Sequence, residues 1–306
     1  MRIAIIGRTE ILYNTAIQLK HAGYIISCIL TAKEAPEYTR TAADFKTLAE
    51  EWNIPFAQGP CIIEHVDFLR ASSSDIALSM NYTGVVPQEV IDLFPHGILN
   101  AHAGDLPRYR GNACQAWAII NGEDRIGLCI HRMIGGELDS GDIIVRDYLF
   151  INMTTKVTQA WNWMIERLPS LFLESITRLM ADPLYVLEQQ SKNPSVALRC
   201  YPRRPEDGCI DWGLSATDLL RLINASNKPY SGAFCSFRDE KLIIWDAELV
   251  GEFENFSAVS GQVTRIGDGF VEVACGEGKL RILSAEYAGQ VDTPNAWIKS
   301  IRKRFK

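Results

Sequence analysis

Two short segments gather the residue types that acyl-transfer chemistry requires. They are NAHAGDLPRYRG at residues 100–111 and DSGD at residues 139–142. Asn100 and His102 stand two apart at the end of an apolar run, so an extended backbone directs both side chains to the same side. A histidine accepts a proton near neutral pH, and a carboxamide donates an uncharged N–H to a developing oxyanion. A carboxylate such as Asp139 orients the imidazole, so the three together suit acyl transfer to an amine.

The elements that must position these residues alternate between apolar strands and helix-like segments. The chain opens with a strand that ends in a turn at Gly7, then a helix over about residues 11–22 and a second strand, IISCILT. The strand-like runs SDIALSM and GILNAH lead to Asn81 and His102. This alternation predicts a Rossmann-like α/β domain with an open parallel sheet. Its ligands should bind outside the carboxyl ends of the strands, where both runs end.

The rest of the chain predicts a second, smaller domain. The strand-like segments GLCIHRMI and DIIVRDYLFI flank the glycine-rich loop GGELDSG, and a long amphipathic helix follows over about residues 155–180. The polar, proline-containing stretch EQQSKNPSVALRCYPRRPEDG fits a linker. Several short strands after it suggest a small, mostly β, OB-like barrel. We therefore predict a catalytic domain at residues 1–200 and a C-terminal domain at residues 201–306.

Several cofactor classes are disfavoured. The eight cysteines include no CxxC pair and the five histidines no HxxxH or HExxH cluster, so we expect reduced, mostly buried thiols and no metal site. A dinucleotide fingerprint needs GxGxxG after the first strand, whereas this chain has GRTEILYN, and NAD is therefore disfavoured.

Charge and hydropathy bear on partners and location. The net charge of −6 weighs against a large nucleic-acid surface, and the basic residues from Lys299 to Lys306 are expected to be a solvated helix end. No apolar run approaches the length of a membrane span, and the N-terminus lacks the pattern of a signal peptide. We expect a cytoplasmic protein without membrane contacts.

The run N-x-H-x-x-x-LP-x-YRG, with D-x-GD about thirty residues later, closely resembles the folate-dependent formyltransferase family. This family includes methionyl-tRNA, glycinamide ribonucleotide and nucleotide-sugar formyltransferases. The resemblance covers nearly the whole chain. IAIIGRTEILYN resembles the family's opening strand and turn, and RRPEDGCIDW and NKPYSGAF resemble second-domain signatures of the methionyl-tRNA and amino-sugar enzymes. These signatures argue against the shorter, single-domain purine enzyme.

The resemblance implies roles for particular residues. Asn100 would stabilise the oxyanion, His102 would take the amine proton and Asp139 would orient the histidine, with 10-formyltetrahydrofolate as co-substrate. The pterin is expected between two loops, near Met80, Asn81, Tyr82, Val85, Val86, Leu138 and Asp142. The acceptor is expected near Arg110, Gln115 and Trp117.

Structural roles stay open for some of these residues. Asp142 would equally cap or brace its loop, Arg110 would shape its loop, and Trp117 would equally belong to the core. His131 lies in a strand-like run without an identifiable partner, so it stays outside the predicted site.

The acceptor amine is the remaining question. A tRNA enzyme of this family should carry a basic insertion after the second strand, whereas the segment here, TAKEAPEYTRTAADF, is short and of mixed charge. We therefore expect a nucleotide-linked amino sugar, as in lipopolysaccharide or glycan biosynthesis. The alternative is a methionyl-tRNA formyltransferase, because the C-terminal signatures are shared with it and the tail is basic.

Two other functions, hydrolysis of the formyl donor and non-catalytic ligand binding, are less well supported by the sequence. A formyltetrahydrofolate hydrolase generally carries an N-terminal regulatory domain, whereas here the strand–turn–helix opening starts at residue 1. A non-catalytic module of the same fold is disfavoured because all three catalytic residues are present. The edges of the short C-terminal strands offer a surface for a homodimer.

Overall fold

The structure, a computed structural model, describes residues 1–251 and 254–306 and divides into two compact units. The first unit comprises Met1–Cys114, Ile126–Leu149 and Trp161–Tyr201, and the second comprises Gln115–Arg125, Phe150–Ala160 and Pro202–Lys306. Each unit has its own hydrophobic core.

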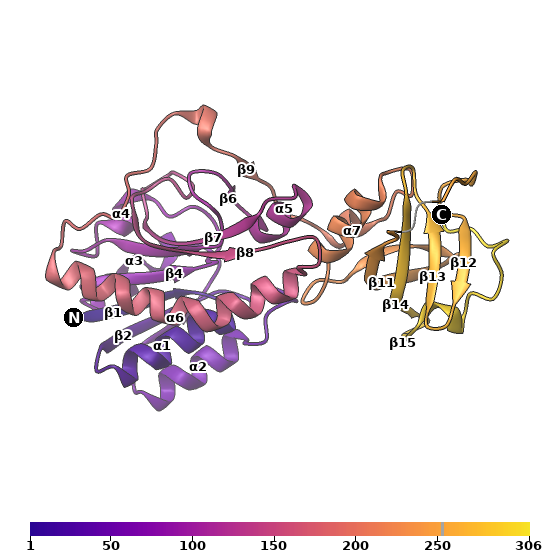
Figure 1. Cartoon of the computed structure of the whole chain (residues 1–306). Coiled ribbons are helices and arrows are strands. Elements are labelled where there is room, and N and C mark those ends of the chain that lie inside the picture. The colour runs from indigo at the N-terminus through magenta and orange to yellow at the C-terminus, as the bar shows by residue number, and fades with distance from the viewer. Residues whose placement is uncertain (252–253) are drawn as a thin grey trace. The chain divides into compact units, whose positions relative to one another are not determined.

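The first unit is built on a seven-stranded sheet (Figure 1). Its strands are β1 (Arg2–Gly7), β2 (Ile25–Thr31), β3 (Phe56–Gln58), β4 (Ile76–Met80), β5 (Ile98–His102), β7 (Arg125–Arg132) and β8 (Ile143–Phe150). They lie in the order β3-β2-β1-β4-β5-β7-β8. The pairs β1–β2, β1–β4, β2–β3 and β4–β5 are parallel, and β5–β7 is antiparallel. This topology confirms the predicted Rossmann-like fold, with an antiparallel pair at the edge that also carries β8.

Helices cover both faces of this sheet. They are α1 (Glu10–His21), α2 (Ala42–Glu51), η1 (Ile62–His65), α3 (Val66–Ala71), α4 (Gln88–Ile91) and α6 (Val157–Ala181). Residues of α1, α2 and α6 share one core with the sheet, and residues of η1, α3 and α4 share the other (Figure 1). In β1, Ile3 and Ile5 belong to the first core while Ala4 and Ile6 belong to the second. A strand buried on both faces explains the continuous apolar run near the N-terminus.

Local signals in the sequence fix where two of these helices begin. The Thr9 hydroxyl accepts the Leu12 N–H (3.2 Å) and caps α1. Thr41 and Asp44 form a capping box at the start of α2, in which each side chain accepts the other's backbone N–H.

The stretch predicted as a linker is structured up to Cys200. Gln190 and Cys200 are buried, η2 (Pro194–Val196) interrupts the stretch, and β9 (Arg199–Cys200) pairs in parallel with β6 (Arg110–Gly111). Gln190 and the strand β9 therefore contact the loop that follows β5, while residues 191–196 between them are exposed.

The second unit is mostly β, as predicted. It contains α5 (Cys114–Ile120) from Gln115 onward, η3 (Pro205–Gly208), α7 (Ala216–Ala225), β10 (Ala233–Phe237), β11 (Glu240–Leu249), β12 (Val263–Gly267), β13 (Phe270–Ala274), β14 (Lys279–Tyr287), β15 (Gln290–Asp292) and η4 (Pro294–Ala296). Its antiparallel strands lie in the order β10-β11-β14-β13-β12, with β15 beside β14. Closure of this sheet into an OB-like barrel stays a prediction.

The predicted helix at the basic C-terminus is wrong. Arg304 forms a β-bridge with Gln262, and the backbone of Lys306 exchanges hydrogen bonds with Ser236. Residues Ser300–Lys306 therefore follow strand edges, where the backbone finds hydrogen-bond partners that an isolated helical turn would lack.

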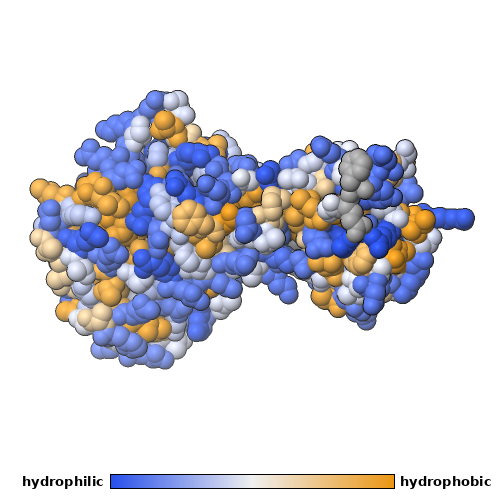
Figure 2. Space-filling model, viewed as in Figure 1, coloured by the Kyte–Doolittle hydropathy of each residue, from blue (hydrophilic) through white to orange (hydrophobic). Residues whose placement is uncertain are grey.

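The surface mixes hydrophobic and hydrophilic residues. On the face shown in Figure 2, hydrophobic residues lie scattered among hydrophilic ones.

Six of the eight cysteines are buried and all are free thiols, which confirms the expectation of reduced, mostly buried cysteines. Among the helices of the described residues, none combines the length and the hydropathy that spanning a bilayer requires.

Candidate active site

The structure brings the three predicted catalytic residues together in the first unit. Asn100 and His102 lie on β5 and are 9% and 7% exposed, and Asp139 lies in the loop between β7 and β8. Nδ1 of His102 is 3.4 Å from Oδ2 of Asp139. Nδ2 of Asn100 is 3.4 Å from Oδ1 of the same carboxylate. Asp139 thus faces both residues at once.

The loop that carries Asp139 is held by hydrogen bonds from two other segments. The backbone N–H of Gly111 donates to Oδ2 of Asp139 (2.9 Å). Nε2 of Gln190 donates to the carbonyl oxygens of Asp139 (3.0 Å) and Gly141 (2.7 Å), and Arg110 in turn donates to Oε1 of Gln190 (2.9 Å). Asp139 adopts a left-handed φ of 47°, which a short polar side chain tolerates. The site therefore depends on Gln190, which the sequence did not single out.

The residues around Asp139 keep it ionised. Burial opposes the ionisation, but nearby His102 and the Gly111 N–H stabilise the charge and hold the pKa of Asp139 well below its usual range. A permanent carboxylate can orient the imidazole of His102 and stabilise a positive charge on it.

The second nitrogen of His102 faces the loop that follows β5. Nε2 lies 2.6 Å from the carbonyl oxygen of Tyr109, which has a left-handed φ of 56°. Gly104 is adjacent to this contact, and a Cβ at Gly104 would collide with the Tyr109 carbonyl oxygen. The glycine in NAHAGD is therefore needed so that the loop can close over the histidine.

His131 is a fourth member of the cluster that the sequence analysis missed. Its Nε2 lies 3.2 Å from Nδ2 of Asn100 and 3.4 Å from Oδ1 of Asp139. His131 reaches the cluster because β5 pairs with β7, with Asn100 and His131 directly opposite each other. Sequence patterns identified both strands without showing that they pair.

The first loop predicted to hold the pterin follows β4. Met80 ends this strand and is buried, and Asn81 donates from Nδ2 to the hydroxyl of Tyr38 (2.9 Å). The Tyr82 hydroxyl donates to the carbonyl oxygen of Gly59 (2.7 Å), and burial raises the pKa of Tyr82 to about 12.

This loop is hydrogen-bonded to the loop that carries Leu138 and Asp142. The Val86 carbonyl accepts the Gly136 N–H (3.2 Å), while the neighbouring Val85 is exposed. Leu138 is half-buried, and the Asp142 carbonyl accepts the backbone N–H of Arg132 (2.9 Å). The two loops are thus joined, and pterin binding by these residues stays a prediction.

Two of the predicted acceptor residues lie in the second unit. Gln115 is buried and donates from Nε2 to the hydroxyl of Tyr230 (3.0 Å). The guanidinium of Arg203 lies over the ring of Trp117, 5.8 Å from its centre. Tyr230 and Arg203 belong to the signatures NKPYSGAF and RRPEDGCIDW, so these signatures hold α5. Acceptor binding by Gln115 and Trp117 stays a prediction.

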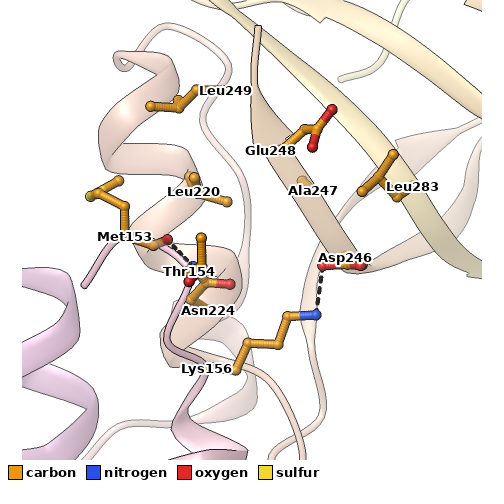
Figure 3. Close-up of a pocket in the computed structure, with 10 residues that line it drawn as sticks. All are labelled: Met153, Thr154, Lys156, Leu220, Asn224, Asp246, Ala247, Glu248, Leu249 and Leu283. Carbon is orange, nitrogen blue, oxygen red and sulfur yellow. Dashed lines mark hydrogen bonds and ion pairs between the residues drawn. The ribbon is translucent and has the colours of Figure 1, made fainter. Parts of the chain in front are cut away.

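A pocket of about 300 Å³ opens within the second unit (Figure 3). Lys156 lies on one side of it and forms an ion pair with Asp246 of β11 (2.5 Å), and Asn224 of α7 donates to the carbonyl oxygen of Met153 (2.8 Å). The pocket is lined by Met153, Thr154, Lys156, Leu220, Asn224, Asp246, Ala247, Glu248, Leu249 and Leu283, none of which is a predicted site residue.

The family of the chain follows from two domain matches. Residues 1–174 match the formyl transferase model, and residues 203–302 match the formyl transferase C-terminal domain model. The chain belongs to the formyl transferase family. This confirms the family predicted from the motifs. The formyl transferase C-terminal domain match also covers both C-terminal signatures.

Solved structures of several proteins share the fold. HypX from Aquifex aeolicus in complex with tetrahydrofolic acid is 17% identical (TM-score 0.63), covering 98% of this chain and 47% of that chain. The N-formyltransferase from Helicobacter canadensis in complex with folinic acid and dTDP-3-aminofucose is 17% identical (TM-score 0.69), covering 92% and 98%. Phosphoribosylglycinamide formyltransferase from Bacillus halodurans is 21% identical (TM-score 0.50), covering 60% and 99%. This chain spans about half the length of the HypX chain.

Proposed function

We propose that this formyl transferase moves the formyl group of 10-formyltetrahydrofolate to the amine of a nucleotide-linked amino sugar. The observation that carries the proposal is the buried cluster in which Asp139 faces both His102 and Asn100 at 3.4 Å. Such a cluster combines a proton acceptor, an uncharged donor and a carboxylate, which are the groups that acyl transfer to an amine requires.

Each residue of the cluster has one task. Asn100 donates an N–H to the formyl oxygen, where negative charge collects as the amine adds to the carbon. His102 accepts the proton that the amine loses, and ionised Asp139 stabilises the resulting imidazolium. The C–N bond to the folate then breaks, and the leaving nitrogen needs a proton, which His102 can return. The net result is a formamide on the acceptor and free tetrahydrofolate.

The folate donor is supported by the site and by related structures. The carbonyl of Val86, in the loop that starts at Met80, accepts the N–H of Gly136, in the β7–β8 loop that also carries Leu138, Asp139 and Asp142. HypX was solved with tetrahydrofolic acid and the Helicobacter canadensis enzyme with folinic acid. We therefore propose that the pterin binds between these loops.

The segment after β2 favours an amino sugar over tRNA. Arg40 of this segment forms an ion pair with Asp44 (3.4 Å), and its guanidinium lies over the ring of Tyr13. Glu34 accepts the backbone N–H of Ala42 (3.2 Å) at the start of α2. Arg40, one of the two basic residues of this segment, is thus engaged within the protein, and three acidic residues stand beside the two basic ones, unlike in a basic arm that grips phosphates. The Helicobacter canadensis structure, with its bound dTDP-3-aminofucose, gives the matching precedent.

The proposal keeps the remaining expectations from the sequence. Arg110, Gln115 and Trp117 stay candidates for the acceptor side, although the structure gives Arg110 and Gln115 hydrogen-bond partners within the protein. We also propose that the boundary between the two domains lies between residues 200 and 201, and that the protein is cytoplasmic. We further propose that it acts in lipopolysaccharide or glycan biosynthesis and forms a homodimer.

An acceptor panel tests this function. Release of tetrahydrofolate is followed by absorbance with nucleotide-linked 3-amino sugars, nucleotide-linked 4-amino sugars, Met-tRNA or water alone as acceptor. We expect turnover with an amino sugar, its loss in His102→Ala, and wild-type turnover in His21→Ala, which removes an exposed histidine of α1. Turnover with tRNA alone would mean that tRNA is the acceptor and not an amino sugar. Turnover with water alone would mean that the protein hydrolyses the formyl donor and does not transfer its formyl group. No turnover at all would refute the proposal.

A further inference from the structure

His131 lies beside Asn100, the proposed oxyanion donor. It lies on β7 opposite Asn100 on β5, and residues opposite one another in antiparallel strands project to the same face of the sheet. The side chain of His131 is only 1% exposed. Its position is therefore fixed by the register of the sheet.

The hydrogen bonds of His131 define which of its nitrogens can accept. Nδ1 lies 2.8 Å from the carbonyl oxygen of Arg132, and because a carbonyl only accepts, Nδ1 carries a hydrogen. In the neutral ring Nε2 then has a free lone pair. This Nε2 lies 3.2 Å from Nδ2 of Asn100, which can donate to it.

The amide of Asn100 is oriented by these contacts. Its nitrogen faces two acceptors, Nε2 of His131 at 3.2 Å and Oδ1 of Asp139 at 3.4 Å. A carboxamide nitrogen carries two hydrogens. When the two acceptors share one of them, with the shorter contact to His131, the other hydrogen is left for a ligand. Rotation of the amide by half a turn would place its oxygen against both acceptors, which His131 and Asp139 together oppose.

We propose that His131 is a positioning residue that accepts one N–H of Asn100 and thereby presents the other N–H to the formyl oxygen. The inference rests on the proposed formyl transfer, because only a reaction with a developing oxyanion requires that second N–H. The proposed role requires a bare Nε2, because a hydrogen on this nitrogen would be donated to Oδ1 of Asp139, 3.4 Å away, and Asn100 would lose its acceptor.

Kinetics of matched variants test this role. We expect His131→Ala to lower kcat about tenfold, as for the loss of one orienting hydrogen bond, with little change in the KM of the formyl donor. His131→Gln should restore most of the rate, because its side-chain oxygen can take the place of Nε2. His96→Gln, at a half-buried histidine before β5, should keep wild-type kcat.

A double-mutant comparison separates positioning from a structural role. Asn100→Ala should cost on the order of a hundredfold in kcat in the wild type and clearly less in the His131→Ala background, because the donor is already misaligned there. Equal costs in both backgrounds would overturn the proposal, since the two residues would then act independently.

Nitrogen NMR of the isotope-labelled wild-type protein at neutral pH tests the geometry without an activity assay. We expect the His131 ring to be protonated at Nδ1 and bare at Nε2. A protonated Nε2 would overturn the proposal, even if every variant folds poorly. If the wild type transfers no formyl group, the proposed function falls, whereas the NMR result still decides whether His131 can hold Asn100.

Discussion

Nε2 of His102 lies 2.6 Å from the carbonyl oxygen of Tyr109, while Nδ1 of the same ring lies 3.4 Å from Oδ2 of Asp139. Both nitrogens therefore face oxygen acceptors. An imidazole takes up a proton only through a nitrogen whose lone pair is free. His102 can thus act as a base only after the loop carrying Tyr109 has moved or the substrate amine has displaced this contact.

Gly104→Ala tests the closeness of this loop. A Cβ at this position would lie 2.5 Å from Nε2 of His102 and would also collide with the backbone oxygen of Tyr109, which moves only together with its loop. We expect the substitution to displace the histidine and lower kcat on the order of a hundredfold. Gly251→Ala is the control, because among the described residues no atom outside its chain neighbours lies within 4 Å of its Cβ position. Wild-type kcat in Gly104→Ala would contradict the close packing.

The ionised Asp139 should make stability depend on acid pH. Burial raises its pKa, but the stronger opposing effects of groups that include His102 and the Gly111 N–H lower the pKa below its usual range in the folded state. A lowered folded pKa stabilises the protein above the unfolded pKa of about 3.9, and this contribution is lost as the pH falls through the folded pKa. The stability difference between wild type and Asp139→Asn should therefore be constant above about pH 5 and shift against the wild type below about pH 4.

Urea unfolding of both proteins at a series of pH values measures this difference. A difference that stays constant down to the most acidic pH at which both proteins fold would mean that Asp139 titrates alike in the folded and unfolded chains.

Thiol labelling should distinguish two exposed cysteines from the rest. Cys61 and Cys209 are exposed, and the other six cysteines are buried. Burial raises the pKa of the Cys129, Cys235 and Cys275 thiols to about 12, so they hold almost no reactive thiolate near neutral pH. A disulfide reagent should modify two of the eight thiols in the native protein and all eight after denaturation. Rapid modification of more than two native thiols would contradict the described burial.

A double-mutant cycle between Gln115 and Tyr230 tests what the C-terminal signature does. The Gln115 side chain is buried and donates to the Tyr230 hydroxyl at 3.0 Å. Gln115→Ala and Tyr230→Phe should each lower the free energy of unfolding by about 1 kcal/mol, and the double variant should cost less than their sum. Unchanged stability together with a raised acceptor KM would instead favour the predicted acceptor contact of Gln115.

Much of the fold was predictable from local pattern. The apolar strands ending at Gly7, Met80 and His102 and the long helix over α6 follow from hydrophobic periodicity, and these elements are found. The two-residue spacing of Asn100 and His102 places both on one face of β5, where the structure finds them facing Asp139. These predictions succeeded because they depend on residues close in sequence.

The rest of the cluster depends on long-range pairing. His131 reaches Asn100 only because β7 pairs with β5 in one particular register, which neither strand's own pattern specifies. Gln190 comes from a polar stretch that reads as a linker, yet it is buried and holds the Asp139 loop. A polar residue used as an internal hydrogen-bond partner has the same composition signal as a solvated one.

Following the formyl carbon itself tests whether the protein transfers it from the folate to the amine of the acceptor. The protein is incubated with carbon-labelled 10-formyltetrahydrofolate and the nucleotide-linked amino sugar that the acceptor panel selects, and the products are analysed by mass spectrometry and NMR. We expect the label to appear as a formamide on the sugar amine, tetrahydrofolate to form in equal amount, and His102→Ala to abolish both. Label recovered as free formate, or a formamide formed equally well by His102→Ala, would contradict this expectation.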